Sequence, residues 1–366
     1  MMDNLAFRGN AAKTLRSLML MTLMTSGAGV HAQSVPANLL DLSIEELFSV
    51  DIHDSDDSNE TNKNRWNFHY SYQRSYFENY SDGGKDLSYD DVLWVPGQET
   101  RTDKNFPVVP THIEQNVHAL VLGYKFTDKL SVRVAVPYIT QSTDHISIVP
   151  GYSEFNISSH GLGDISVLGS RHFAISENKS WVLGLGLSLP TGSIDEQGDT
   201  PRAPGEQQLP YTMQLGSGTY DIPVVVSYLN KKDTFSWGAD FAAKARLGKN
   251  DRHYRLGNSA SVSGWIKLTT INWIEPSLRL TYRYTDKISG EDSSLKVPGA
   301  FPYPAPVVDP RLFGGKQVDL LFGLKIPISN PDQYVDLVVG RPVYQSLNGP
   351  QSSEDYRLSL SLNLGF

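Results

Sequence analysis

From residue 65 to the C-terminus, apolar and polar side chains alternate with a period of two. Trp66, Phe68 and Tyr70 are separated by Asn67 and His69, and similar alternation returns in later segments along the chain. Successive side chains of a β-strand point to opposite faces, so each segment would have one apolar and one polar face. Segments of this kind, separated by turn residues, are typical of transmembrane barrels, whose outer face meets lipid and whose inner face lines a lumen.

The connections between these segments alternate in length. The short ones are 126–129, 175–180, 230–233 and 330–332, and the long ones, rich in polar residues, Gly and Pro, are 78–112, 140–160, 191–215 and 286–315. Short turns at one end and long loops at the other are characteristic of outer-membrane barrels. With both chain ends on the short-turn side the strand number is even, and we count about twelve strands. We therefore predict an all-β fold, a transmembrane antiparallel β-barrel over residues 65–366.

Alternating strands also build soluble β-sandwiches, in which one face packs into a core. Three features favour the membrane barrel over this alternative. They are the alternating loop lengths, a terminal strand that ends in Phe, and aromatic residues near strand ends, namely Tyr124, Tyr138, Trp181 and Trp265.

The last predicted strand shows the clearest alternation. Its apolar positions are Tyr356, Leu358, Leu360, Leu362, Leu364 and Phe366. A C-terminal aromatic residue on an amphipathic strand resembles the signal by which bacterial outer-membrane proteins reach the barrel-assembly machinery. We therefore expect these positions to form the assembly signal. The expected location is the bacterial outer membrane, with its lipid bilayer as a partner.

Residues 1–32 have the pattern of a secretory signal peptide. Basic residues at Arg8, Lys13 and Arg16 precede a short apolar run, and small residues follow. We predict cleavage between Ala32 and Gln33, which implies export.

Residues 33–64 are predicted to be a periplasmic segment. Ser43 and Glu46 have the spacing of a helix capping box, so a short capped helix is expected within residues 41–52. Residues 52–64 are polar and acidic, as expected for a linker.

Composition excludes several classes of function. The chain of 366 residues has no Cys, which removes thiol catalysis, Cys-ligated zinc and disulfides. The formal net charge of −8 argues against nucleic acid as a partner, because phosphate binding needs a basic face. His112 and His118 have no clear third ligand on one strand face, so neither a metal nor another cofactor is predicted.

The polar faces of the predicted strands carry charged residues that would line the lumen. Seven are basic and three acidic, namely Arg133, Lys244, Arg246, Arg279, Arg283, Lys325 and Arg357 with Asp240, Asp319 and Asp336. Twelve strands lie between small filled barrels and wide porins. This lumen is therefore either a narrow, mildly cationic pore or a polar core closed by ion pairs, and these residues are the candidates for selectivity.

An enzyme is the weaker alternative. His69 and Ser71 lie two residues apart on one predicted strand face, the spacing found in outer-membrane lipid hydrolases. Nucleophilic catalysis needs this pair within hydrogen-bonding distance and a third group to orient it. The polar face of the strand also carries Asn67 and Gln73 and faces the lumen, whereas a lipid-cleaving site should open toward the bilayer. We therefore expect that the protein is not an enzyme.

Four segments resemble the outer-membrane family named for the meta-pathway of phenol degradation. They are GLGDISVLGSRHF (161–173), LGLSLPTGS (185–193), MQLGSGTYDIPVVVSY (213–228) and GRPVYQSLNGPQ (340–351). The resemblance spans most of the barrel from about residue 117 and implies a transporter for small aromatic or hydrophobic compounds. Some relatives carry Met- and His-rich segments suggestive of copper, but after signal cleavage this chain retains only Met213.

Together these observations predict an outer-membrane channel or transporter for small aromatic, hydrophobic or anionic solutes. Two alternatives remain open at this stage. One is a lipid hydrolase that uses His69 and Ser71, and the other is a closed barrel with a binding or structural role.

Overall fold

The computed structural model describes residues 65–366 apart from residues 272, 330 and 331. The predicted signal peptide, the cleavage point between Ala32 and Gln33 and the capped helix at Ser43 lie outside the described residues. In the described ranges, no helix is both long and apolar enough to cross a membrane.

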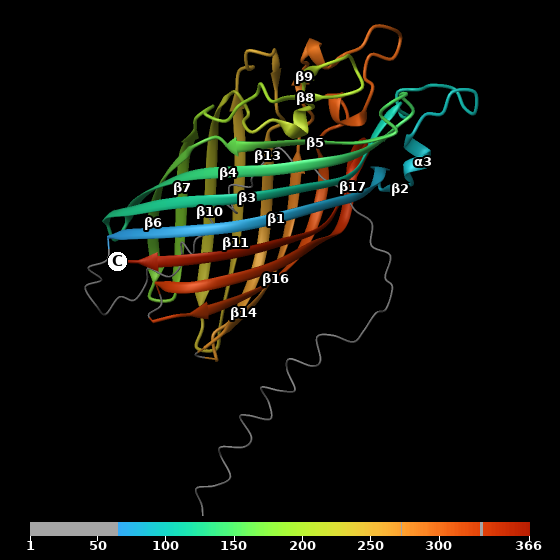
Figure 1. Cartoon of the computed structure of the whole chain (residues 1–366). Coiled ribbons are helices and arrows are strands. Elements are labelled where there is room, and N and C mark those ends of the chain that lie inside the picture. Colours follow the sequence, from blue (N-terminus) through green and yellow to red (C-terminus); the bar gives the residue numbers. More distant parts are fainter. Residues whose placement is uncertain (1–64, 272, 330–331) are drawn as a thin grey trace, which may run out of the picture. The chain divides into compact units, whose positions relative to one another are not determined.

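The described chain is dominated by long antiparallel strands. The strands on the barrel path are β1 (Trp66–Gly83), β3 (Val108–Thr127), β4 (Leu130–Ser147), β6 (Ser166–Ser176), β7 (Lys179–Ser188), β10 (Tyr220–Lys231), β11 (Phe235–Leu247), β13 (Ser259–Leu268), β14 (Glu275–Thr285), β16 (Gly315–Pro327) and β17 (Gln333–Gly365). Each pairs with its neighbour in chain order, and β1 also pairs with β17. This last pairing closes the sheet into a barrel (Figure 1).

The strand β17 crosses the barrel twice. Its first part, from Tyr334 to Leu347, pairs with β16, and its second part, from Gln351 to Gly365, pairs with β1. The chain reverses at Gly349, which has a φ of +91° that favours glycine. Ten strands of the described path therefore cross once and β17 twice, which gives twelve antiparallel segments, in agreement with the prediction of about twelve.

The outer face of this barrel is apolar and the inner face is polar. Along β7, Trp181, Leu183 and Leu185 point outward, and Leu185 is 61% exposed. Between them, Ser180 and Val182 are buried on the inner side. A closed barrel that exposes an apolar outer surface is stable in lipid, because closure leaves no unpaired strand edge in the hydrocarbon. The structure thus confirms the predicted fold class.

Two of the predicted long loops are partly strand. The strand β1 continues to Gly83 and β3 begins at Val108, so the loop predicted over 78–112 is shorter at both ends. Within the predicted loop 140–160, β4 continues to Ser147, and a further strand, β5 (Glu154–Leu162), pairs with this extension. The polar residues of these segments do not prevent pairing, because backbone hydrogen bonds between strands are independent of side-chain polarity.

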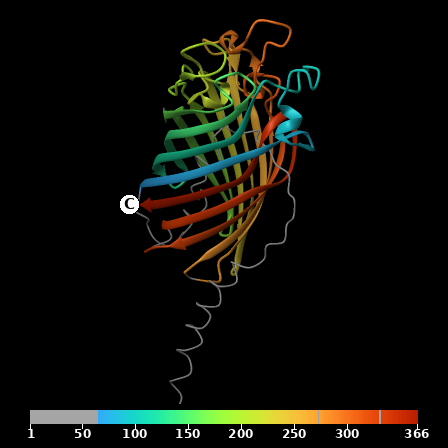
Figure 2. The same ribbon diagram turned by 45° about the vertical axis from the view of Figure 1, so that its right-hand side comes forward.

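The remaining elements are short and lie in the connections. They are β2 (Lys85–Leu87), α3 (Tyr89–Val92), β8 (Gln197–Asp199), β9 (Glu206–Gln208), β12 (Tyr254–Arg255) and β15 (Ser289–Gly290), with the 3₁₀ turns η1 (Tyr211–Met213), η2 (Ser293–Leu295) and η3 (Pro306–Val308). The long connections gather at one end of the barrel, which we call the loop end (Figures 1 and 2). The opposite end, with the short connections, is called the turn end.

Candidate functional site: the barrel lumen

The structure places all ten predicted lumen residues on the inner side of the strands. Lys244, Arg246, Arg283, Lys325 and Arg357 are buried there together with Asp240 and Asp319. Arg279 reaches them from β14, Asp336 lies opposite Lys325 in the β16–β17 register, and Arg133 lines a hollow at the turn end. Six of these ten residues belong to three clusters along the barrel wall.

The first cluster surrounds Asp240 on β11. One carboxylate oxygen of Asp240 lies 2.8 Å from an Arg279 guanidinium nitrogen and accepts a 2.9 Å hydrogen bond from the indole of Trp265. The same guanidinium donates to Ser263 at 2.9 Å. The Trp265 ring lies where a Cβ on Gly238 would be, 2.5 Å from that position, so only glycine permits this packing. These donors hold the Asp240 carboxylate against β13 and β14.

Trp265 lies near the end of β13, as the sequence predicts, but its side chain points into the lumen and does not contribute to an outer aromatic belt. The cross-strand pair with Gly238 explains this orientation, because paired residues on adjacent strands face the same side. The expected aromatic belt is instead represented at the turn end by Trp181, which packs on Tyr228 with ring centroids 5.0 Å apart.

The second cluster joins β14, β16 and β17. Arg283 lies 2.9 Å from Asp319, and Arg357 lies 2.6 Å from Glu354. The amide of Gln317 bridges the two acids and donates at 2.5 Å to Asp319 and at 2.7 Å to Glu354. The two ion pairs thus form one continuous network.

The third cluster lies toward the loop end of β10 and β11. Arg246 and Asp221 form a buried ion pair of 2.6 Å. Thr219 also donates to Asp221 at 2.7 Å, and Arg246 donates to the carbonyl of Gly257 at 3.0 Å. Burial of this pair is tolerated because these further hydrogen bonds satisfy both partners.

Sequence reasoning missed the lumen acids Asp221, Glu354 and Glu275, the last of which lies 3.2 Å from the inward Lys267. Asp221 could have been found, because its neighbours Tyr220 and Ile222 belong to the outward set of the same strand. Glu354 could not, because a bulge at Asp355 shifts the alternation by one residue between the pairs Tyr76–Tyr356 and Phe77–Glu354. Each of these acids forms an ion pair with a basic residue, so the lumen carries more negative charge than predicted.

The two halves of the lumen wall differ in chemistry. The charge clusters lie on β10, β11, β14, β16 and β17. The other half has mainly small, apolar and amide side chains besides Arg133. A buried apolar cluster runs along the inner wall from Ala119, Val121, Ala135 and Leu168 on this half to Val225 on β10 and Ala242 on β11. Higher on this half, Gln115 donates to Gln141, and Gln141 donates to Ser159. The lumen is therefore amphipathic around its circumference.

Solvent does not reach most of these inner side chains. Val121 and Leu168 on one half, and Arg246 and Asp319 on the other, are buried. A solute that passes through this lumen must therefore displace the side chains that shield these buried residues from solvent. At the turn end the lumen opens into a small hollow, which includes Lys125, Arg133 and His172 in its lining.

The histidines of interest lie on different faces of the barrel wall. His69 is buried on the inner side of β1, and Ser71 lies on the same side. This pair therefore does not open toward lipid. His118 lies on the outer side, where Nδ1 is 2.8 Å from the Tyr70 hydroxyl, and His112 lies 3.5 Å from Glu78. Among residues 65–366 that are described, no three His, Asp or Glu side chains are grouped so that they could hold a metal ion.

The terminal strand points its predicted apolar residues outward. Tyr356 and Leu360 are exposed on the barrel surface, and the backbone of Phe366 exchanges two hydrogen bonds of 3.0 Å with that of Trp66. The terminal residue thus completes the closure of the barrel. Recognition of this strand by the assembly machinery stays a prediction.

Comparison with known proteins identifies the fold. Over 93% of this chain and 100% of the other, the structure is similar to the COG4313 outer membrane channel from Pseudomonas putida F1, with a TM-score of 0.54 and 12% identity. More distant likenesses are the TodX monoaromatic hydrocarbon channel (TM-score 0.44, 12% identity, 83% of this chain and 91% of the other) and the KdgM porin (TM-score 0.39, 8% identity, 82% and 99%). No family model and no curated protein sequence matches the chain.

At this level of identity the similarity concerns the fold alone. The resemblance to the phenol meta-pathway family therefore stays a prediction. The closed barrel, its apolar outer surface and the similarity to the Pseudomonas putida channel agree with one another. The chain has the fold of a bacterial outer-membrane β-barrel channel, which places it in the outer membrane.

Proposed function

We propose that this protein is an outer-membrane channel for small solutes that combine an apolar body with a negative charge. The observation that carries the proposal is the amphipathic lumen of a closed barrel. Basic residues slightly exceed acidic ones on one half of the wall, and an apolar cluster extends from Ala119 on the other half to Val225 and Ala242 on β10 and β11. A small aromatic or aliphatic anion could contact both halves at once.

The charge clusters support a preference for anions. Charged side chains inside a low-dielectric wall focus the electric field on a passing ion. Asp240, Asp319 and Glu354 are each within ion-pair distance of an arginine, so the acids are largely neutralised locally. The remaining basic excess favours negative solutes.

The test is conduction by purified protein in planar bilayers, with liposome swelling for neutral and anionic solutes. We expect anion-selective conductance. Because Arg279 and Arg283 face the lumen, the double variant Arg279→Glu with Arg283→Glu should shift the reversal potential toward cations. The double variant Arg279→Gln with Arg283→Gln should give a smaller shift of the reversal potential in the same direction. It replaces the charge-reversal variant if that variant does not fold.

The matched control is Arg171→Glu. Arg171 lies on the outer side of β6 and stacks on Phe173, so its charge does not line the passage. We expect the Arg171→Glu variant to have the same reversal potential as the wild type. If wild-type barrels that are correctly closed show neither conductance nor solute flux, the channel proposal is wrong and the closed-barrel alternative replaces it.

A further inference from the structure

The connections at the loop end form a folded cap with its own apolar core. Tyr211, Tyr254, Leu295 and Val308 come from three different connections and are buried in one cluster. We define the cap as connections 189–219, 248–258 and 286–314. Val108 at the start of β3 belongs to the same cluster and donates to the carbonyl of Pro304 at 3.1 Å. Because β3 and β14 are separated by β1, β17 and β16 along the sheet, the cap reaches across the barrel mouth.

One part of the cap is anchored to the barrel wall. We call connection 189–219 the wall loop. Its segment around Met213 packs on the inner side of β4 and β5, where Ser159 donates to the Met213 carbonyl at 2.7 Å. Gln141 also donates to the Gln214 carbonyl, and Ile157 packs with Leu209 and Met213. The wall loop is thus held by the barrel itself.

The other part consists of two connections that are joined to each other. We call 248–258 and 286–314 the paired loops, because β12 in one pairs with β15 in the other. The cross-strand pairs are Tyr254 with Gly290 and Arg255 with Ser289. The two connections are therefore expected to move as one unit.

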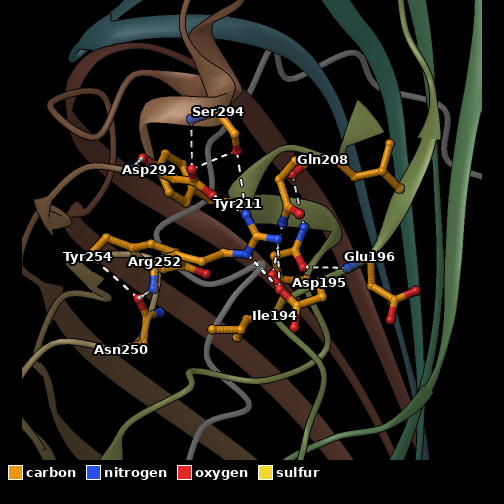
Figure 3. Close-up of polar contacts among 12 residues, drawn as sticks. Ile194, Asp195, Glu196, Gln208, Tyr211, Asn250, Arg252, Tyr254, Asp292 and Ser294 are labelled. Carbon is orange, nitrogen blue, oxygen red and sulfur yellow. Dashed lines mark hydrogen bonds and ion pairs between the residues drawn. The ribbon is translucent and has the colours of Figure 1, made fainter. Parts of the chain in front are cut away.

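A small polar interface joins the paired loops to the wall loop (Figure 3). Arg252 of the paired loops lies 2.7 Å from Asp195 of the wall loop and 3.1 Å from Asp292 of its own unit. Asn250 donates to the Ser217 carbonyl at 3.0 Å, and the Tyr211 hydroxyl accepts from the backbone N–H of Asp292 at 2.9 Å. The Tyr211 ring also packs on Tyr254, with centroids 4.8 Å apart.

The two ion pairs of Arg252 differ in strength. The Asp195 side chain is 70% exposed, so water competes for this pair and the pair contributes little. The Asp292 side chain is 5% exposed and also accepts from the backbone N–H of Ser294, which fixes it within the paired loops. Arg252 is therefore firmly held on one side of the interface and weakly on the other.

We propose that the cap is the gate of the channel, which opens when the paired loops separate from the wall loop, with Arg252 as the latch. This inference rests on the proposed channel function. The polar contacts broken on opening can be replaced by water, whereas the anchor of the wall loop and the β12–β15 pairing persist. Opening also breaks the hydrogen bond of 2.7 Å from Arg202 to the Ser294 carbonyl and separates Tyr211 from the apolar side chains of the paired loops.

A disulfide across the interface provides a reversible lock. The chain has no Cys, so an added pair has no competing thiol. A Cβ at position 218 would lie 2.7 Å from the Asn250 Cβ. The two Cβ atoms of a disulfide are about 3.5–4.5 Å apart, so a small outward shift of one loop would permit the bond. In Gly218→Cys with Asn250→Cys, oxidation should abolish most of the solute flux, and reduction should restore it. Equal flux in both states of a barrel shown to be cross-linked overturns the gate.

The matched control is a lock inside the moving unit. Arg255→Cys with Ser289→Cys joins β12 to β15 without crossing the interface, so its oxidation should leave flux unchanged. A loss of flux as large as that of the first lock would show that cross-linking any loop closes the barrel, and the proposed hinge would be wrong.

A second pair of variants tests the latch without cysteines. Arg252→Ala should raise flux roughly fivefold, the factor that corresponds to one exposed ion pair. Lys296→Ala removes an ion pair of 2.7 Å with Glu291 inside one connection and should change nothing. If the wild type shows flux and Arg252→Ala shows the same flux, Arg252 is not the latch, although the channel proposal is unaffected. Absence of flux in the wild type, Arg252→Ala and the reduced lock contradicts the channel, and the gate with it.

Discussion

Single residues in the lumen are held by several partners, and Asp240 is the clearest case. Its carboxylate faces Arg279, Trp265 and Ser263, and one of its oxygens is shared by donors from two other strands. A buried carboxylate of this kind links β11, β13 and β14 through side chains as well as through the backbone. Removal of the acid leaves the opposing donors without an acceptor.

We expect Asp240→Ala to destabilise the barrel by roughly 1–3 kcal/mol, because the guanidinium and the indole lose their partner in a largely dry site. The measurement is the temperature at which the unboiled, fast-migrating band of the folded barrel disappears in SDS. Asp233→Ala, in the exposed turn before β11, is the control and should leave this temperature unchanged.

The double variant Asp240→Ala with Arg279→Met distinguishes the ion pair from a simple loss of packing. It should recover part of the stability, since neither partner remains unpaired. If the two substitutions are additive, the pair does not stabilise the structure in the way described.

Among the elements, β17 contributes most to the closure of the barrel. It supplies two neighbouring barrel segments and meets both β16 and β1, so the whole ring depends on one hairpin. Its second half is opposite β1 from Gly365 to Leu347, and its apolar side chains alternate outward. A charge on this face has to enter lipid.

We expect Leu360→Arg to lower the yield of membrane-inserted protein, because Arg near the bilayer midplane costs about 2–4 kcal/mol. Yield is measured as the detergent-extracted, heat-modifiable fraction of total protein. Leu360→Ile keeps the face apolar and serves as the control. Equal yields for all three proteins would mean that this face does not meet lipid.

On the scale of the whole molecule, the cap introduces a dependence on pH. Burial raises the pKa of Tyr211 well above the ordinary value of about 10, and the nearby Asp292 and Glu291 raise it further. Burial also raises the pKa of Tyr254, which packs beside it. The closed cap therefore favours the neutral phenols.

The sign of the effect follows from this preference. A raised pKa in the closed state contributes stability that is complete below about pH 10 and is lost at higher pH, because the phenols of an opened cap ionise there. We expect solute flux to rise above about pH 10 as the cap opens. Tyr211→Phe should weaken this rise, while flux that stays constant from about pH 8 to 11 would contradict the role of the tyrosines.

Apart from the bulged part of β17, the face that each strand turns to the lumen follows from its local alternation. Alternation is a local property, because every strand residue points opposite to its neighbour whatever strand lies alongside. For this reason Arg283, Lys325 and Asp319 could be placed inside from the pattern alone. The closed barrel and its approximate strand number followed from the repetition of the pattern and from the loop lengths.

Which charges meet depends on the register between strands, and strands that are neighbours in the barrel can be distant in sequence. A bulge at Asp355 brought Glu354 to Arg357, and the pairing of β13 with β11 turned Trp265 inward over Gly238. The cap could not be predicted for the same reason. Its core forms only where barrel closure brings three connections together, and nothing local in those connections specifies their partners.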